Sequence, residues 1–248
     1  MGLSDKSCDV NLELLMDTIR CLDYESVIVE KPSINYIITV IGLMWEHVDH
    51  TKFDLRKFVI KILSRIGYPT SAIICDKDFD KENGTFSGLD SWIDEVSLTI
   101  NQMKNEIMVA NQKYLLTDYQ KQIWDSMDSD KVLGISAPTS AGKSFVILLK
   151  LVDRLINDNI DIVYIVPTLS LLNQVTEDFN RELKIVGVTD YWISNSFDDQ
   201  QLSNKKNIYI MTQEKAIAAF SDTEKAFTKR LILVADEIQN IERIREDK

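Results

Sequence analysis

Residues 132–145 read VLGISAPTSAGKSF, and this stretch decides which class of fold the chain adopts. An apolar segment, 132–136, precedes a run of small residues, which ends in Gly142, Lys143 and Ser144 at the start of a helical pattern. A strand, a small-residue loop and a helix in this order form a phosphate-binding loop, because N–H groups of the loop and the helix N-terminus face the phosphate oxygens. We therefore expect a nucleotide to bind here.

The residue types of this loop suit separate tasks. Lys143 would reach the β- and γ-phosphates, Ser144 would offer its hydroxyl to Mg²⁺, and Gly142 would let the backbone approach without a Cβ in the way. The expected nucleotide-binding residues are Ala137, Pro138, Thr139, Ser140, Ala141, Gly142, Lys143 and Ser144. Ala137 departs from the general G-x-x-x-x-G-K-[ST] pattern, which has glycine there. A chance turn of small residues is the alternative, and the flanking strand and helix patterns argue against it.

A second stretch, LILVADEIQNI at 231–241, places two carboxylates after an apolar strand. The carboxyl ends of parallel strands are where ligands bind in open α/β sheets. Asp236 would hold Mg²⁺ directly or through water, and Glu237 would act as the general base on an attacking water. With Lys143, these two residues are the candidate catalytic groups.

The chain changes character near residue 112, and the second part alternates short apolar runs with helical patterns. The expected strands are 132–136, 160–167, 185–192, 208–211 and 231–235. The expected helices between them are 145–156 and 169–183. Nearly continuous apolar strands that alternate with helices indicate a parallel sheet covered on both faces.

The first part, 1–112, is predicted to be helical. Its candidate helices are 11–20, 33–48 and 53–66. A further stripe at helical spacing consists of Trp92, Val96, Ile100, Met103 and Ile107. Such stripes are more often core than cofactor site. A charged loop, 76–88, lies between the helices, and His47 and His50 suit a solvated helix end better than a metal site.

Composition limits the partners and the compartment. The chain has 28 Lys and Arg against 39 Asp and Glu, a net charge of -11, so a broad basic nucleic-acid surface is not expected. A few well-placed phosphate contacts remain compatible with this charge. Three widely spaced cysteines without a C-x-x-C pair indicate a reducing, cytoplasmic setting. The most apolar stretch, 34–45, is shorter than the roughly 20 residues that span a bilayer, so no membrane association is expected.

The motifs together resemble superfamily-two helicases, the DExD/H-box translocases. APTSAGKS at 137–144 resembles motif I, and DEIQ at 236–239 resembles motif II. LTDYQ at 116–120, YIVPTLSLL at 164–172 and MTQEKA at 211–216 resemble the segment before motif I, motif Ia and motif Ib. The last segment is most similar to the Ski-type branch, and the general pattern resembles helicases of bacterial antiphage defence such as the Hachiman type. The resemblance covers about 114–241.

The resemblance implies further roles. Gln120 would read adenine, since an amide pairs with N6 and N7 of that base; a surface glutamine on a helix is the alternative. Pro167, Thr168 and Thr212 would contact the nucleic-acid backbone, although either threonine is equally suited to a simple helix cap. Gln239 would couple the ATP site to the nucleic acid, and many relatives have His or Asp there.

The resemblance also indicates what the 248 residues lack. The family's next strand, which inserts between the phosphate-loop strand and the Asp-Glu strand, does not occur before Lys248. The second lobe with its arginine finger does not occur either. We expect residues 1–248 alone to bind nucleotide weakly and to hydrolyse almost none, because such fingers contribute roughly 10³–10⁵ in rate.

The sequence therefore predicts an α/β protein with an all-helical accessory domain, 1–112, and an incomplete RecA-like parallel-sheet lobe, 113–248. The expected function is that of an ATP- and Mg²⁺-dependent helicase or translocase on DNA or RNA. A partner protein docked on the helical domain, or a helical domain that guards the nucleic-acid channel, is also compatible. The alternatives are a degenerate lobe that serves as a nucleotide-regulated interaction module and a phosphate-loop NTPase unrelated to nucleic acid.

Overall fold

The computed structural model describes residues 11–28, 31–80, 85–89, 91–129, 132–137, 141–196, 205–221 and 230–236, with only the backbone for 31–33 and 129. The chain forms two compact units whose segments alternate along the sequence. The first comprises the residues up to Ile107 together with Tyr114–Gln122, and the second comprises Met108–Lys113 and the residues from Ile123 onward. The boundary expected near residue 112 stays a prediction.

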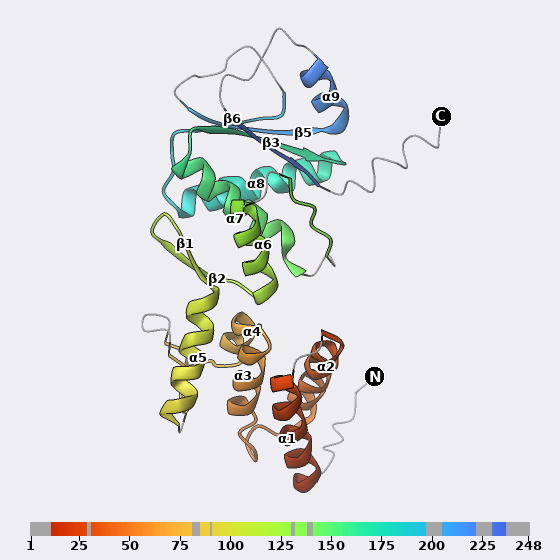
Figure 1. The fold of residues 1–248 in the computed structure, drawn as a ribbon, viewed down its shortest axis with the longest axis vertical. Coiled ribbons are helices and arrows are strands. Elements are labelled where there is room, and N and C mark those ends of the chain that lie inside the picture. Colours follow the sequence, from red (N-terminus) through yellow and green to blue (C-terminus); the bar gives the residue numbers. More distant parts are fainter. Residues whose placement is uncertain are drawn as a thin grey trace, which may run out of the picture. The chain divides into compact units, whose positions relative to one another are not determined.

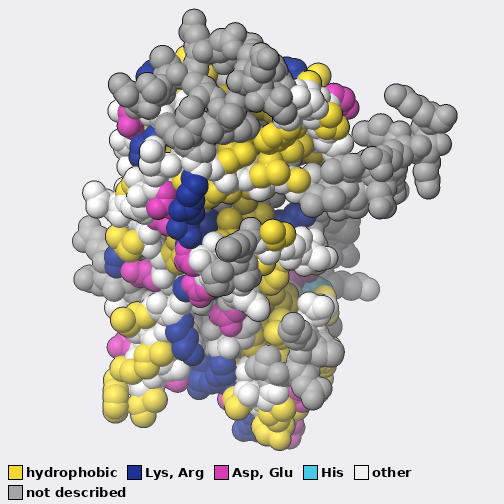
Figure 2. All heavy atoms as spheres, turned by 45° about the horizontal axis from the view of Figure 1, so that its top comes forward, with side chains coloured by type: hydrophobic (Ala, Val, Ile, Leu, Met, Phe, Trp, Pro, Cys, Tyr) yellow, Lys and Arg dark blue, Asp and Glu magenta, His cyan; other side chains and the backbone are white. Residues whose placement is uncertain are grey.

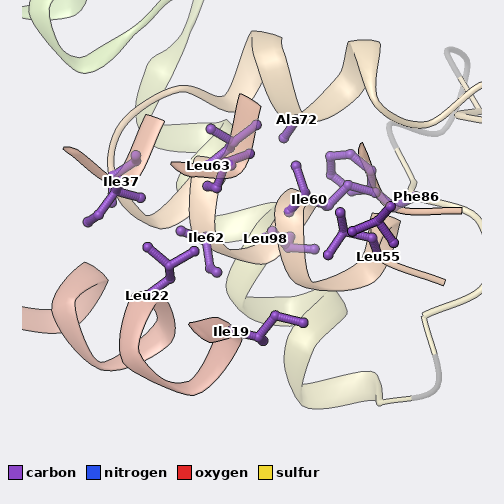
Figure 3. Close-up of a cluster of buried hydrophobic side chains, with 14 of the residues drawn as sticks. Ile19, Leu22, Ile37, Leu55, Ile60, Ile62, Leu63, Ala72, Phe86 and Leu98 are labelled. Atoms are coloured by element: carbon purple, nitrogen blue, oxygen red, sulfur yellow. The ribbon is translucent and has the colours of Figure 1, made fainter. Parts of the chain in front are cut away.

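The first unit is built mainly from helices (Figure 1). They are α1 (Leu12–Ile28), α2 (Lys31–His47), α3 (Arg56–Arg65), α4 (Pro69–Ile74) and α5 (Trp92–Asn105). Apolar side chains at helical spacing on α1, α2, α3 and α5 meet in one core, which includes Ile19, Ile37, Ile60, Ile62 and Leu98 (Figure 3). The helical interpretation of this part is confirmed, with α4 as an additional short helix.

A buried carboxylate organises the chain between α4 and α5. The side chain of Asp76 is fully buried and accepts hydrogen bonds from the backbone N–H and the hydroxyl of Ser87, both at 2.7 Å. Arg56 of α3 adds a charged contact to the same carboxylate at 3.3 Å. Residues 81–84 of the charged loop predicted at 76–88 lie outside the described residues. The contacts of Asp76 with Ser87 and with Arg56 fix the two ends of this loop to α3.

The face of α5 that packs inward is the opposite of the one that the apolar stripe predicts. Four members of the stripe are exposed, among them Trp92 (73%) and Met103 (70%), whereas Leu98 on the other face is 3% exposed. Ile107 is buried, but it lies beyond the helix in β1 (Glu106–Val109). The expectation that this stripe forms core was wrong for the helix, because periodicity defines an apolar face without saying that anything covers it.

The second unit contains a parallel sheet. Its strands are β3 (Ile160–Val166), β4 (Tyr191–Ser194), β5 (Lys206–Thr212) and β6 (Arg230–Ala235), in the order β4-β5-β3-β6. Helices α7 (Lys143–Asn157) and α8 (Leu169–Ile185) contact β3 on one face, and α9 (Gln213–Ser221) contacts β3 and β5 on the other (Figure 1). A small hairpin of β1 and β2 (Gln112–Leu115) precedes α6 (Asp118–Ser129).

Two predicted strands differ from the observed structure. Residues 132–136 form no strand, and Val132 is 92% exposed. Among the described residues no strand pairs with this segment, and an extended segment without a ladder partner cannot satisfy its backbone groups as a strand does. The strand expected at 185–192 is shorter, because α8 continues to Ile185 and β4 begins only at Tyr191.

The reversed burial of α5 predicts unequal effects of two neighbouring truncations. Leu98→Ala should lower the free energy of unfolding by about 2–5 kcal/mol, since it leaves a cavity in the core. Ile100→Ala, on the exposed face, should change it by about 0.5 kcal/mol or less. Urea unfolding followed by circular dichroism measures both, and an equal loss from the two variants would place the stripe in a core after all.

Candidate functional site

The carboxyl ends of three parallel strands meet at one edge of the sheet. Val166 of β3 pairs with Thr212 of β5, and Ile165 pairs with Ala235 of β6. The residues that follow, Pro167, Thr168 and Asp236, therefore lie at the same edge. The structure thus brings together, at one edge of the sheet, residues that the sequence analysis predicted to contact nucleic acid, Pro167 and Thr168, and a residue predicted to bind Mg²⁺, Asp236. In open α/β sheets this is the edge where ligands bind.

Asp236 is attached to β3 through its backbone and its side chain. Its N–H donates to the oxygen of Ile165 at 3.0 Å, and the Tyr164 hydroxyl donates to its Oδ2 at 3.2 Å. Burial, and secondarily the neighbouring Asp236 carboxylate, raise the pKa of Tyr164 well above its ordinary value. A phenol is protonated at neutral pH even at its ordinary pKa of about 10, and the raised pKa keeps Tyr164 a donor to the carboxylate at alkaline pH as well. The sequence reasoning missed Tyr164, whose only signal is a hydroxyl in a largely apolar strand.

The phosphate-loop residues that the structure describes have the geometry of a helix start. Gly142 has φ 67° and ψ 28°, a left-handed conformation that favours glycine, and it is the N-cap of α7. Lys143 and Ser144 follow as the first two residues of α7, and the Ser144 side chain is exposed. Ala137 and Ala141 are described on either side of Pro138, Thr139 and Ser140, which lie outside the described residues.

The residues present fit a nucleotide with magnesium. The first turn of α7 leaves N–H groups without helical acceptors, Lys143 supplies a cation, and Ser144 and Asp236 supply the oxygen ligands that Mg²⁺ prefers. No cluster of three or more His, Cys, Asp or Glu that could hold a metal occurs among the described residues.

The two threonines at the sheet edge act locally as helix-start residues. Thr168 is the N-cap of α8 and its hydroxyl oxygen accepts the N–H of Leu171 at 3.3 Å. Thr212 directly precedes α9, and hydrogen bonds from the backbone of Glu214 and from the Thr212 side chain lower the pKa of Glu214. Both threonines thus lie at helix starts, and their hydroxyls and the first N–H groups of α8 and α9 are at the same edge of the sheet as Asp236. A phosphate role for them stays a prediction.

Gln120 takes part in a capping box at the start of α6. Its side-chain oxygen accepts the N–H of Thr117 at 3.0 Å, and the Thr117 hydroxyl accepts the N–H of Gln120 at 3.3 Å. This reciprocal pair is a known helix-start motif, so Gln120 has a structural task apart from any adenine contact. Gln120 belongs to the first unit and Lys143 to the second.

A buried lysine joins α6 to α7 within the second unit, and the sequence reasoning missed it. The Lys150 ammonium lies 2.8 Å from Asp128 and 4.2 Å from the ring centroid of Trp124. Arg154 contacts the same Asp128 carboxylate at 2.9 Å. A lysine inside the apolar face of a predicted helix was the available signal, because such a residue needs an anionic or aromatic partner when buried.

Other predicted features have plain local surroundings. His47, at the end of α2, and His50, just beyond it, are exposed. A ring nitrogen of His47 lies 3.0 Å from a main-chain oxygen, and a ring nitrogen of His50 lies 2.8 Å from another.

Figure 2 shows Lys and Arg side chains lying beside Asp and Glu on the face that it draws. Glu237 and Gln239 lie outside the described residues. Among the described helices, none is long and apolar enough to cross a membrane.

Comparison with known proteins places these features in a family. Residues 117–248 match the DEAD/DEAH box helicase family. The chain is similar to "Activating signal cointegrator 1 complex subunit 3" of Dictyostelium discoideum, with 32% identity over 50% of this chain and 6% of that protein. It is also similar to "Putative helicase 7" of a Sulfolobus islandicus filamentous virus, with 32% identity over 51% of this chain and 21% of that protein.

The match begins at Thr117, the N-cap of α6, and includes the phosphate loop, the sheet edge and the Asp-Glu pair. The segments alike in sequence span only a small part of these relatives. Family match and sheet topology agree on a RecA-like lobe that follows a helical region. The chain belongs to the DEAD/DEAH box helicase family.

Proposed function

We propose that the protein couples ATP hydrolysis to movement along, or unwinding of, a DNA or RNA strand. The observation that carries the proposal is the register of β3 with β5 and β6, which aligns Thr168, Thr212 and Asp236 at one edge. The proposed nucleic-acid contacts, Thr168 and Thr212, and the proposed metal ligand, Asp236, are then linked through directly paired strands. The family match supports this proposal for the class of protein.

The roles of the chain's own residues follow from their chemistry. Lys143 neutralises charge on the β- and γ-phosphates, and Gly142 with the N–H groups of α7 receives the phosphate oxygens. Ser144 and Asp236 would hold Mg²⁺, which supplies further charge neutralisation at the phosphates. Glu237 accepts the proton of the attacking water. Thr168 and Thr212 bind the nucleic-acid backbone without reading its sequence.

The finer assignments belong to this proposal. They are membership of the Ski-type branch, a part in antiviral defence of the Hachiman type, a cytoplasmic location and a partner protein on the helical region. Two other functions are tested with the main one: an interaction module with a degenerate nucleotide site, and an NTPase unrelated to nucleic acid. ATP turnover by the full natural chain, with and without DNA or RNA, distinguishes the three. Stimulation by nucleic acid supports the helicase.

Lys143→Ala should lower nucleic-acid-stimulated ATP turnover by a factor of about 10²–10³, because the phosphate charge loses a preorganised cation. Lys184→Ala, an exposed lysine in the last turn of α8, removes the same charge away from the loop and should leave turnover unchanged. Steady-state phosphate release measures both variants. Wild-type turnover by Lys143→Ala would remove the assignment of the phosphate loop.

Glu237→Gln should keep ATP binding and slow hydrolysis by a factor of about 10²–10⁴, since the amide cannot accept the proton of the water. The variant should therefore accumulate an ATP-bound complex on nucleic acid, which a filter-binding assay with labelled ATP detects. A collapse of nucleotide affinity in this variant would instead give Glu237 a structural role.

The two possible tasks of Gln120 can be separated by a pair of substitutions. Gln120→Glu keeps an oxygen for the N–H of Thr117 but has no donor for adenine N7, so it should lose the preference for ATP over GTP at unchanged stability. Gln120→Ala should lose that preference and also about 1 kcal/mol of stability. Competition binding with ATP and GTP, together with thermal melting, gives both quantities. Unchanged discrimination in both variants would show that adenine is read elsewhere.

A further inference from the structure

Tyr164 connects the strand before the predicted nucleic-acid contacts to the predicted metal ligand. It lies on β3, four residues before Thr168, and its hydroxyl donates to Oδ2 of Asp236 at 3.2 Å. None of the roles assigned so far to the sheet edge uses this hydroxyl. We propose that Tyr164 is a positioning residue, which orients the Asp236 carboxylate for Mg²⁺; the proposal rests on the proposed function.

The ring of Tyr164 is held in one place. It is 2% exposed, and it meets Phe179 of α8 edge to face at a centroid distance of 6.3 Å and an interplanar angle of 83°. Its strand is paired on both sides, with Ile210 of β5 and Val234 of β6 opposite Tyr164. A side chain packed in this way delivers its hydroxyl to a fixed point in the sheet.

The Asp236 backbone is also fixed, because its N–H donates to Ile165 at 3.0 Å. The direction of its two carboxylate oxygens also depends on the rotation of its side chain. A hydrogen bond from Tyr164 to Oδ2 restricts that rotation and so sets the direction of the other carboxylate oxygen, Oδ1. Outer-shell partners of metal-binding carboxylates act in this way, and their removal typically weakens metal binding by about 10–100-fold.

The same sheet offers a matched control. Tyr209 lies on the neighbouring strand β5, is 4% exposed, and packs with Val163, Met211 and Ala216. Val163 pairs with Tyr209 and directly precedes Tyr164 on β3, so the two tyrosines face opposite sides of the sheet. Replacing either tyrosine by phenylalanine removes one hydroxyl from the sheet, and the hydroxyl of Tyr164 is the one that donates to Asp236.

The test uses the full natural chain and Mn²⁺ as a paramagnetic substitute for Mg²⁺. Electron paramagnetic resonance gives the Kd of Mn²⁺ in the presence of a non-hydrolysable ATP analogue. Tyr164→Phe should raise this Kd about tenfold, whereas Tyr209→Phe should leave it within about twofold of the wild-type value. Affinity for the analogue in EDTA should be unchanged in both variants, because the phosphate loop holds the nucleotide without the metal.

A purely structural defect predicts a different pattern. It would weaken nucleotide binding in EDTA as much as Mn²⁺ binding, and that result would overturn the proposal. If Tyr164→Phe melts at a lower temperature than Tyr209→Phe, 4-aminophenylalanine at position 164 decides the matter, since it returns an N–H donor to the same ring. Recovery of Mn²⁺ affinity with this residue supports the positioning role, and no recovery overturns it.

The experiment also separates the two proposals. Wild-type protein that binds Mn²⁺ with the analogue, together with a Tyr164→Phe variant that binds equally well, overturns the role of Tyr164 alone. Wild-type protein that binds neither the analogue nor Mn²⁺ overturns the proposed function, and the role of Tyr164 with it.

Discussion

The parallel pairing of β3 with both β5 and β6 is the constraint on which the second unit depends. β3 is buried almost throughout, so its apolar side chains need cover on both faces, which α7, α8 and α9 supply. Because side chains alternate along a strand, the register that buries these residues also fixes where the three strands end. Thr212 and Asp236 stand beside the end of β3 for this reason. Core packing thus determines the geometry of the candidate site.

The phosphate loop depends on a different constraint, the conformation of a single residue. Gly142 adopts a left-handed conformation directly before α7, where a side chain would be strained. The turn lets the chain enter a helix whose apolar face, including Val146, Leu149 and Val152, is fully buried. Burial of α7 therefore holds Gly142, Lys143 and Ser144 at the start of the helix.

Sequence reasoning succeeded where one local pattern decides the outcome and failed where a distant partner decides it. The apolar runs of β3, β5 and β6 predicted those strands and the parallel sheet that they form. Residues 132–136 have an equally apolar pattern, yet no described strand pairs with them. The stripe on α5 has helical period, but Leu98 on the other face packs inward. The sequence did not indicate Tyr164, because its contact with Asp236 forms only when β3 pairs with β6.

Helix starts explain why local contacts and ligand contacts coincide at this site. Thr168 caps α8, and Gln120 with Thr117 caps α6, so each of these side chains already satisfies a backbone N–H. A cap satisfies one or two of the four N–H groups that a helix leaves without acceptors, and the others still face outward as donors. A phosphate placed there would meet those N–H groups and the positive end of the helix dipole. Capping by Thr168 therefore does not compete with a phosphate contact at α8; it holds the helix start in the conformation that such a contact requires.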